Sequence, residues 1–208
     1  MEFKVENTQV FGLERAIKAS GNPMRTVLND TEELGLKDLK RGSALGSVPA
    51  GTGHDNFLNG VIVQFDVTAP LYWWKQAQRY HFLDYVSSQS TMHRLAKFDI
   101  GEQVVEETDP AIVSRYRELV QQYNSLPEDT DESEKKKLWR TLVASLPCGF
   151  CLGATMTTNY RQLKTIYYQR KDHKLSEWHV FCKWIESLPM FYELILKNGN
   201  KQEEDKNL

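Results

Sequence analysis

The spacing of hydrophobic residues changes several times along the chain, and the first clear pattern is that of strands. Residues 2–11 alternate loosely between apolar and polar positions, which predicts a strand. Residues 60–68 alternate more strictly and predict a second, while the run FCLGATMT at 150–157 predicts a third. The side chains that would share one face of the second strand are Val61, Val63, Phe65 and Val67.

Between these strands the apolar positions recur every three or four residues, as helices require. Two helices have clear start signals, since Asp109 precedes Pro110, and Asp131 with Glu134 fits a capping box. Residues 41–60 hold five Gly and one Pro and predict a loop. The predicted helices cover residues 13–19, 28–39, 70–86, 110–123, a stretch after 131, 159–170 and 175–188, with a last turn after Pro189.

Few strands and many helices that do not alternate strictly favour an α+β fold over a doubly wound sheet. The length of 208 residues fits one domain. We place that domain at 1–197. The remaining residues, 198–208, are polar and charged apart from one leucine and predict a disordered tail.

Composition narrows the classes of partner. The 26 basic and 28 acidic residues nearly balance, so neither nucleic acid nor a membrane surface is an expected partner. No apolar run reaches the length of a membrane span, and MEFKVENTQV lacks the features of a signal peptide. Three cysteines do not make a disulfide framework, so we expect a cytoplasmic protein with reduced thiols.

Cys148 and Cys151 form a C-x-x-C motif. A thioredoxin-like pair would follow a strand and open a helix, whereas here Pro147 precedes the motif and a strand follows it. A zinc site would need two further ligands. Buried thiols are therefore the preferred interpretation and no metal is expected, with a thiol redox protein as an alternative.

Several polar side chains are candidates for binding an anion. Gln76 and Arg79 would lie on one stripe of the helix predicted at 70–86, together with Leu83. Guanidinium groups suit carboxylates and phosphates, but an ordinary solvated face fits the same pattern. Tyr72-Trp73-Trp74 would cover all sides of this helix start, so we expect at least one ring to meet a ligand or a partner subunit.

A second group of candidates lies at 159–170. Asn159 can cap the helix, while Arg161 and Arg170 are nine residues apart and point in directions that differ by about 180°. They would serve two parts of a long ligand, or a ligand and a subunit interface; two surface arginines are the plainer alternative. His54 follows Gly51-Thr52-Gly53, a loop whose backbone can approach a ligand.

Two runs of the sequence resemble the flavin-dependent thymidylate synthases (ThyX). GHDNFLNGVIVQFDVTAPLYWWKQAQRYH is similar to the loop, strand and Q-x-x-R-H-R helix of that family, and LPCGFCLGATMTTNYRQLKTIYYQRKDHKLSEW to its L-P, N-x-R and R-x-D segment. The resemblance extends over residues 10–195, although 95–145 match only as helices. It implies a ThyX-like α+β fold, with a central antiparallel sheet flanked by helices, and a homotetramer with sites shared between subunits.

The resemblance also implies a ligand set and an activity. A member of this family is a flavoprotein of nucleotide biosynthesis, a methyltransferase that binds FAD and a pyrimidine nucleotide. It methylates dUMP at C5 with methylenetetrahydrofolate and NADPH as co-substrates. The implied cofactor-binding residues are His54, Arg79, Asn159 and Arg161; the implied nucleotide-binding residues are Gln76 and Arg170, the latter at the pyrimidine base.

The sequence departs from the family where the nucleotide phosphate would bind. The R-H-R triplet reads Arg79-Tyr80-His81, and without gaps the phosphate-binding Ser and Arg fall on Gln89 and Thr91. Small shifts of register would supply Ser90 and Arg94 instead, and Arg140 is a further candidate. An alternative is therefore a catalytically inert, homo-oligomeric homologue that binds nucleotides or other proteins.

Overall fold

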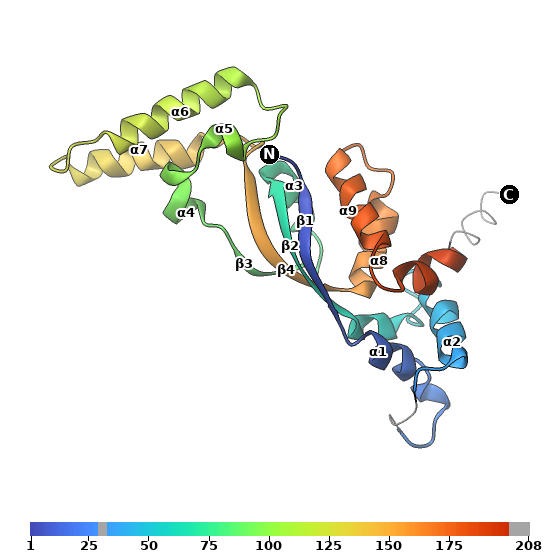
Figure 1. The fold of residues 1–208 in the computed structure, drawn as a ribbon. Helices are drawn as coiled ribbons and strands as arrows, with labels where there is room; N and C mark the ends of the chain where they lie inside the picture. Colours follow the sequence, from blue (N-terminus) through green and yellow to red (C-terminus); the bar gives the residue numbers. More distant parts are fainter. Residues whose placement is uncertain (29–32, 200–208) are drawn as a thin grey trace. The chain divides into compact units, whose positions relative to one another are not determined.

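A computed structural model describes residues 1–28 and 33–199 of the protein (Figure 1). Most of the predicted tail, residues 200–208, lies outside the described residues. Within the described part of the chain, no helix is both long and apolar enough to cross a membrane.

Four strands form one antiparallel sheet in the order β1-β2-β4-β3. They are β1 (Lys4–Phe11), β2 (Ile62–Pro70), β3 (Asp84–Ser88) and β4 (Cys151–Asn159). The chain combines these strands with many helices, so the predicted α+β class with an antiparallel sheet is confirmed.

Several helices begin at a capping side chain, whereas α1, α3 and α9 begin without one. Asp109 and Asp131 each accept a backbone hydrogen bond from two residues ahead, at 2.7 and 2.9 Å, and so start α6 and α7. The helices are α1 (Leu13–Ala19), α2 (Leu36–Gly46), α3 (Leu71–Ala77), α4 (Thr91–Arg94), α5 (Ile100–Gln103), α6 (Pro110–Asn124), α7 (Glu132–Ala144), α8 (Tyr160–Arg170) and α9 (Ser176–Glu186). Short 3-10 turns are η1 (Asn22–Met24), η2 (Asn56–Gly60) and η3 (Leu95–Lys97), and η4 (Tyr192–Leu196) is a π-helical turn.

Two predicted elements are wrong in extent. The helix predicted over 70–86 ends at Ala77, and β3 occupies 84–88. Phe82 adopts a left-handed φ of 61°, which a continuing helix excludes, and Tyr85 and Val86 suit a strand. Of the helix predicted over 28–39, residues 29–32 lie outside the described residues, and the helix of the structure runs from Leu36 to Gly46, into the predicted loop.

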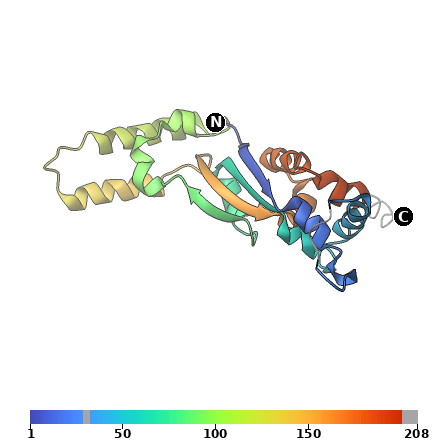
Figure 2. The same cartoon turned by 60° about the horizontal axis from the view of Figure 1, so that its bottom comes forward.

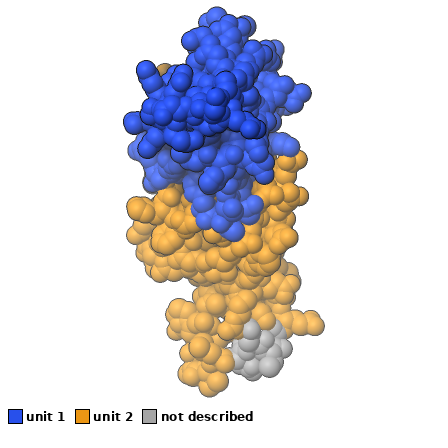
Figure 3. Space-filling model, turned by 90° about the vertical axis from the view of Figure 1, so that its left-hand side faces the viewer, with its two compact units in different colours: residues 1–4, 67–79, 85–155 blue, residues 5–66, 80–84, 156–208 orange. Residues whose placement is uncertain are grey.

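The chain forms two compact units, coloured separately in Figure 3. Unit 1 comprises residues 1–4, 67–79 and 85–155. Unit 2 comprises residues 5–66, 80–84 and those from 156 onward.

Unit 1 contains a core beneath the hairpin of α6 and α7, which lie side by side in both Figures 1 and 2. The Tyr116 hydroxyl of α6 donates to the backbone oxygen of Leu142 in α7 at 3.1 Å. Burial raises the pKa of Tyr116 to about 12, so this donor stays protonated. The buried members of this core are Leu95, Ile100, Val104, Val113, Tyr116, Leu119, Leu142 and Phe150.

In unit 2, β2 packs against α9. Phe65 of β2 packs against Phe181 and Trp184 of α9, with ring centroids 5.9 and 4.4 Å apart. Val61 and Val63 of the same stripe are fully buried, as is Val67 further along β2, which confirms the predicted inward face of this strand.

Candidate functional site

The junction between β4 and α8 places Asn159 and Arg161 together. Asn159 has an extended backbone, and its side-chain oxygen accepts from the Gln162 backbone N–H at 2.9 Å. It is therefore the N-cap that turns the strand into the helix, as predicted. Arg161 leaves the first turn of α8 with 34% of its side chain exposed.

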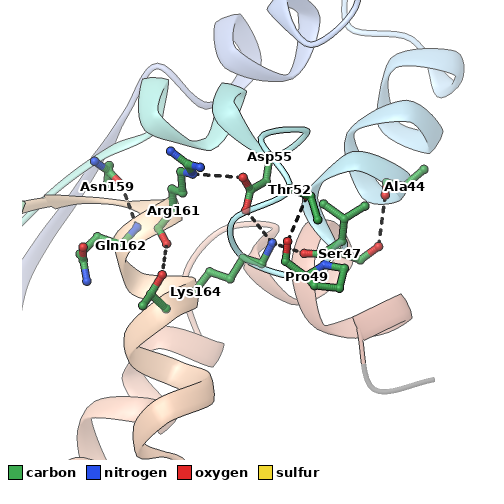
Figure 4. Close-up of polar contacts among 11 residues, drawn as sticks. Ala44, Ser47, Pro49, Thr52, Asp55, Asn159, Arg161, Gln162 and Lys164 are labelled. Atoms are coloured by element: carbon green, nitrogen blue, oxygen red, sulfur yellow. Dashed lines mark hydrogen bonds and ion pairs between the residues drawn. The ribbon is translucent and has the colours of Figure 1, made fainter. Parts of the chain in front are cut away.

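A buried carboxylate holds this arginine in place (Figure 4). Asp55 is fully buried; its Oδ1 accepts from Arg161 Nε at 3.0 Å, and its Oδ2 from Lys164 Nζ at 2.8 Å. Lys164 also donates to the backbone oxygen of Val48 at 2.5 Å. A charged side chain is rarely buried without a partner, and here two cations share one anion.

His54 precedes Asp55 at the end of the predicted glycine-rich loop and is exposed. Gly51 and Gly53 have φ of +92° and +79°, and within the described chain no atom lies within 4 Å of a Cβ built on either. Their backbone conformation, and not lack of space, requires glycine there. The contact between Asp55 and Arg161 thus holds the residue that follows His54 against the first turn of α8, the helix that Asn159 caps.

Arg170, at the end of α8, belongs to a different cluster. Its Nε donates to the Tyr80 hydroxyl at 2.7 Å, and its guanidinium carbon lies 4.6 Å from the ring centroid of Trp178. Tyr80 in turn donates to Gln169 at 3.1 Å. This is a cation–π arrangement on a buried indole, which fixes the arginine plane. Arg161 and Arg170 therefore contact different groups, Asp55 in the one case and Tyr80 with Trp178 in the other.

His173 lies next to this cluster. Its Nδ1 accepts from the Leu175 backbone N–H at 3.1 Å, and its ring centroid is 6.3 Å from that of Trp178. Burial and, after it, the charges of Arg170 and His179 lower the pKa of His173, while Glu177 acts in the opposite direction. The neutral imidazole is thus the favoured form beside Arg170.

The predicted stripe of Gln76, Arg79 and Leu83 is not helical. Gln76 lies in the last turn of α3, and Arg79 lies in the turn that follows and is exposed. The Arg79 backbone N–H bonds to the Gln76 carbonyl at 3.4 Å, so the two remain neighbours.

Ser90 lines a pocket of about 440 Å³ in unit 1. Trp74 and Tyr85 form an aromatic part of its lining, with ring centroids 5.1 Å apart, and burial raises the pKa of Tyr85. The Ser90 hydroxyl oxygen caps α4 by accepting from the His93 backbone N–H at 3.3 Å. Arg94, at the end of that turn, is exposed, and its backbone N–H bonds to the Ser90 carbonyl at 3.1 Å.

The predicted site residues thus fall into the two units. Unit 2 holds His54, Asn159, Arg161 and Arg170, and unit 1 holds Gln76, Arg79, Ser90 and Arg94. Their roles in binding stay predictions.

Sequence reasoning missed the residues that orient these side chains. Lys164 had a readable signal, because it falls in the buried stripe of α8 with Tyr160, Leu163 and Tyr167, where an apolar residue is the rule. Asp55 had none, since an aspartate in a glycine-rich loop is ordinary.

None of the three cysteines forms a disulfide; Cys151 and Cys182 are buried, whereas Cys148 is exposed, so the prediction of buried thiols is wrong for Cys148. Burial, followed by the charges of Glu186 and Asp172, raises the pKa of Cys182 to about 12. Among residues 1–28 and 33–199, no group of three or more His, Cys, Asp or Glu side chains could hold a metal ion.

No protein-family model and no curated protein sequence matches this chain. Among solved structures, two crystal structures of the flavin-dependent thymidylate synthase ThyX from Helicobacter pylori, complexed with FAD and dUMP, are similar to it. The first gives a TM-score of 0.66 at 15% identity, covering 93% of this chain and 96% of that chain. The second gives 0.68 at 15% identity, covering 92% and 96%. The fold of this chain is therefore ThyX-like, as the two sequence runs predicted, whereas family membership stays a prediction.

Proposed function

We propose that this protein binds FAD and a pyrimidine deoxynucleotide and methylates dUMP, or a related pyrimidine nucleotide, at C5. The observation that carries the proposal is the likeness to ThyX structures complexed with FAD and dUMP over 92–93% of this chain. Fold alone does not fix function, so the side chains on α8 are the second support.

The residues at the start of α8 fit a flavin nucleotide chemically. Arg161 supplies a partly exposed guanidinium whose Nε is held by Asp55, and such groups suit a diphosphate. The Asn159 side-chain oxygen is engaged in the helix cap, which leaves its amide N–H groups as the available donors. His54 contributes an exposed imidazole from the adjacent loop. We assign these residues, with Arg79, to FAD.

For the nucleotide we assign Arg170 to the pyrimidine base, and Gln76, Ser90 and Arg94 to the remainder. Arg170 is held by Tyr80 and Trp178, so little conformational freedom is lost on binding. Ser90 offers a hydroxyl beside an aromatic wall. Arg94 would provide the charge-assisted hydrogen bonds that a phosphate needs.

Reduced FAD, when bound, supplies the redox chemistry, with NADPH as reductant and methylenetetrahydrofolate as carbon donor. The residues of this chain orient the ring systems and balance the phosphate charge; none needs to act as a nucleophile. We further propose that the protein works as a cytoplasmic homotetramer with sites shared between subunits.

Flavin binding is the first test. Purified protein is titrated with FAD and followed by flavin fluorescence and absorbance, in the wild type and in Arg161→Ala. The matched control is Arg115→Ala, which removes an exposed arginine of α6 paired with Glu118. We expect FAD binding by the wild type and the control, and a loss of at least about tenfold in affinity for Arg161→Ala, since a charge-assisted hydrogen bond contributes about 1.5–3 kcal/mol.

Turnover is tested by dUMP methylation in vitro and by growth of a thymidine auxotroph that carries the gene. Growth without thymidine supports the full proposal. FAD and dUMP binding without methylation would leave a nucleotide-binding homologue that is catalytically inert. A protein that takes up neither ligand overturns the proposal.

A further inference from the structure

One ammonium group closes the base of the glycine-rich loop at 49–54. Lys164 Nζ donates to the carbonyl of Val48, just before the loop, and to the carboxylate of Asp55, just after it, at 2.5 and 2.8 Å. The side chains of Lys164 and Asp55 are each only 1% exposed. Figure 4 shows Lys164 reaching from α8 to Asp55. The two ends of the loop are thus fastened to the same point of one helix.

The segments on either side of the loop are fixed as well. Before it, α2 ends at Gly46, where any side chain would collide with the backbone oxygen of Leu194 in η4. After it, the Asp55 carbonyl accepts from the Leu58 backbone N–H at 3.0 Å, and Leu58 is fully buried. Between these anchors the loop tip is exposed, so a rigid base carries an accessible tip.

The same carboxylate also sets the direction of Arg161. Lys164 occupies one oxygen of Asp55, which leaves the other for Arg161 Nε at 3.0 Å. Arg161 and Lys164 are three residues apart on α8 and therefore share a face. Two cations and one carboxylate leave the cluster with a net positive charge, and Arg161 is its partly exposed member.

We propose that Lys164 and Asp55 are positioning residues. They close the base of loop 49–54 and orient Arg161, so that His54 and Arg161 meet one anionic ligand from a fixed geometry. The identity of that ligand as FAD rests on the proposed function, whereas the closed loop does not.

A purely structural ion pair makes a different prediction. Replacing a buried ion pair by apolar side chains of similar size is often neutral or stabilising, whereas removing one partner is strongly destabilising. A structural role alone therefore predicts that an apolar pair restores both the stability of the protein and its ligand binding. A positioning role predicts that it restores stability and leaves ligand binding impaired.

The experiment compares Lys164→Met with the double variant Asp55→Leu/Lys164→Met. Lys183→Met, an exposed lysine of α9, is the control. Three quantities are measured in each: the urea midpoint, hydrogen exchange of the amides in 50–58, which include the buried and hydrogen-bonded amide of Leu58, and the Kd for FAD. In Lys164→Met we expect a lower urea midpoint, loop exchange at least about tenfold faster and FAD binding at least about tenfold weaker, because charge-assisted hydrogen bonds are lost.

The double variant distinguishes a positioning role of Lys164 and Asp55 from a purely structural one. We expect its urea midpoint to return toward the wild-type value while its loop exchange stays fast and its FAD binding stays weak. Wild-type loop protection together with wild-type FAD affinity in this variant would overturn the proposal, as would unchanged loop exchange in Lys164→Met. If the wild type binds no FAD, the proposed function fails, and loop exchange in the two variants still decides whether the loop is closed by Lys164.

Discussion

Removal of the Trp178 ring tests the aromatic cluster around Arg170. The indole is fully buried, and its centroid lies 5.8 Å from Phe181, 6.0 Å from Tyr80 and 4.6 Å from the guanidinium carbon of Arg170. Burial of a tryptophan removes about 200 Å² from water, worth about 5 kcal/mol at 25 cal/mol per Å². The cation–π contact adds about 1 kcal/mol.

Relaxation of the cavity recovers part of this loss, so we expect Trp178→Ala to lower the free energy of unfolding by about 4 kcal/mol. Trp178→Phe, which keeps a ring, should cost about 1–2 kcal/mol. Trp139, a partly buried indole on α7, provides the comparison: Trp139→Ala should cost less than Trp178→Ala because it buries less surface.

Urea denaturation followed by circular dichroism measures all three variants. A loss below about 1 kcal/mol in Trp178→Ala, or a larger loss in Trp139→Ala, would show that the packing argument is wrong. The proposed role of Arg170 adds that Trp178→Phe weakens dUMP binding more than it weakens FAD binding.

Three further predictions concern single side chains. Ellman's reagent should modify Cys148 quickly in the native protein and Cys182 only on unfolding, because burial raises the pKa of the Cys182 thiol to about 12; equal rates would contradict this. Burial lowers the pKa of His173, so its contribution to stability is fully present above the ordinary value of about 6.5 and declines as the pH falls toward the lower folded pKa. Urea midpoints between about pH 5 and 7.5 should therefore depend on pH less in His173→Asn than in the wild type. Asn159→Ala should cost about 1 kcal/mol of stability and Asn159→Asp close to none, since aspartate caps a helix equally well; thermal denaturation distinguishes the two.

Much of the fold could be predicted because its signals are local. The inward face of β2 follows from residues two apart, and the starts of α6, α7 and α8 follow from capping side chains within three residues of the helix. The end of α3 could not be predicted in this way. Lys75 to Leu83 are compatible with a helix, and what ends it is the pairing of β3 at the edge of the sheet, where Gln89 bonds to Gly153, more than sixty residues away.

The candidate site likewise contains residues that local sequence signals predict and residues that they do not. Asn159 and Arg161 could be found because their roles depend on position at a helix start. The buried carboxylate of Asp55 bonds to Lys164, which lies 109 residues further along the sequence. No short-range sequence pattern predicts that contact. Lys164 does stand out in an apolar stripe, so a charged residue in such a stripe is a useful indicator of a distant buried counterion.

The division into two compact units has a consequence for how the chain can fold. Each unit is assembled from three separate segments, so the backbone passes from one to the other five times. All four strands of the sheet contain residues of both units, so a single cut at a linker cannot release either one whole. Unit 2 also requires residues after 155 together with residues before 67. During synthesis on the ribosome, neither unit is complete when the first 150 residues have emerged, and the finished core has to wait for the C-terminal helices.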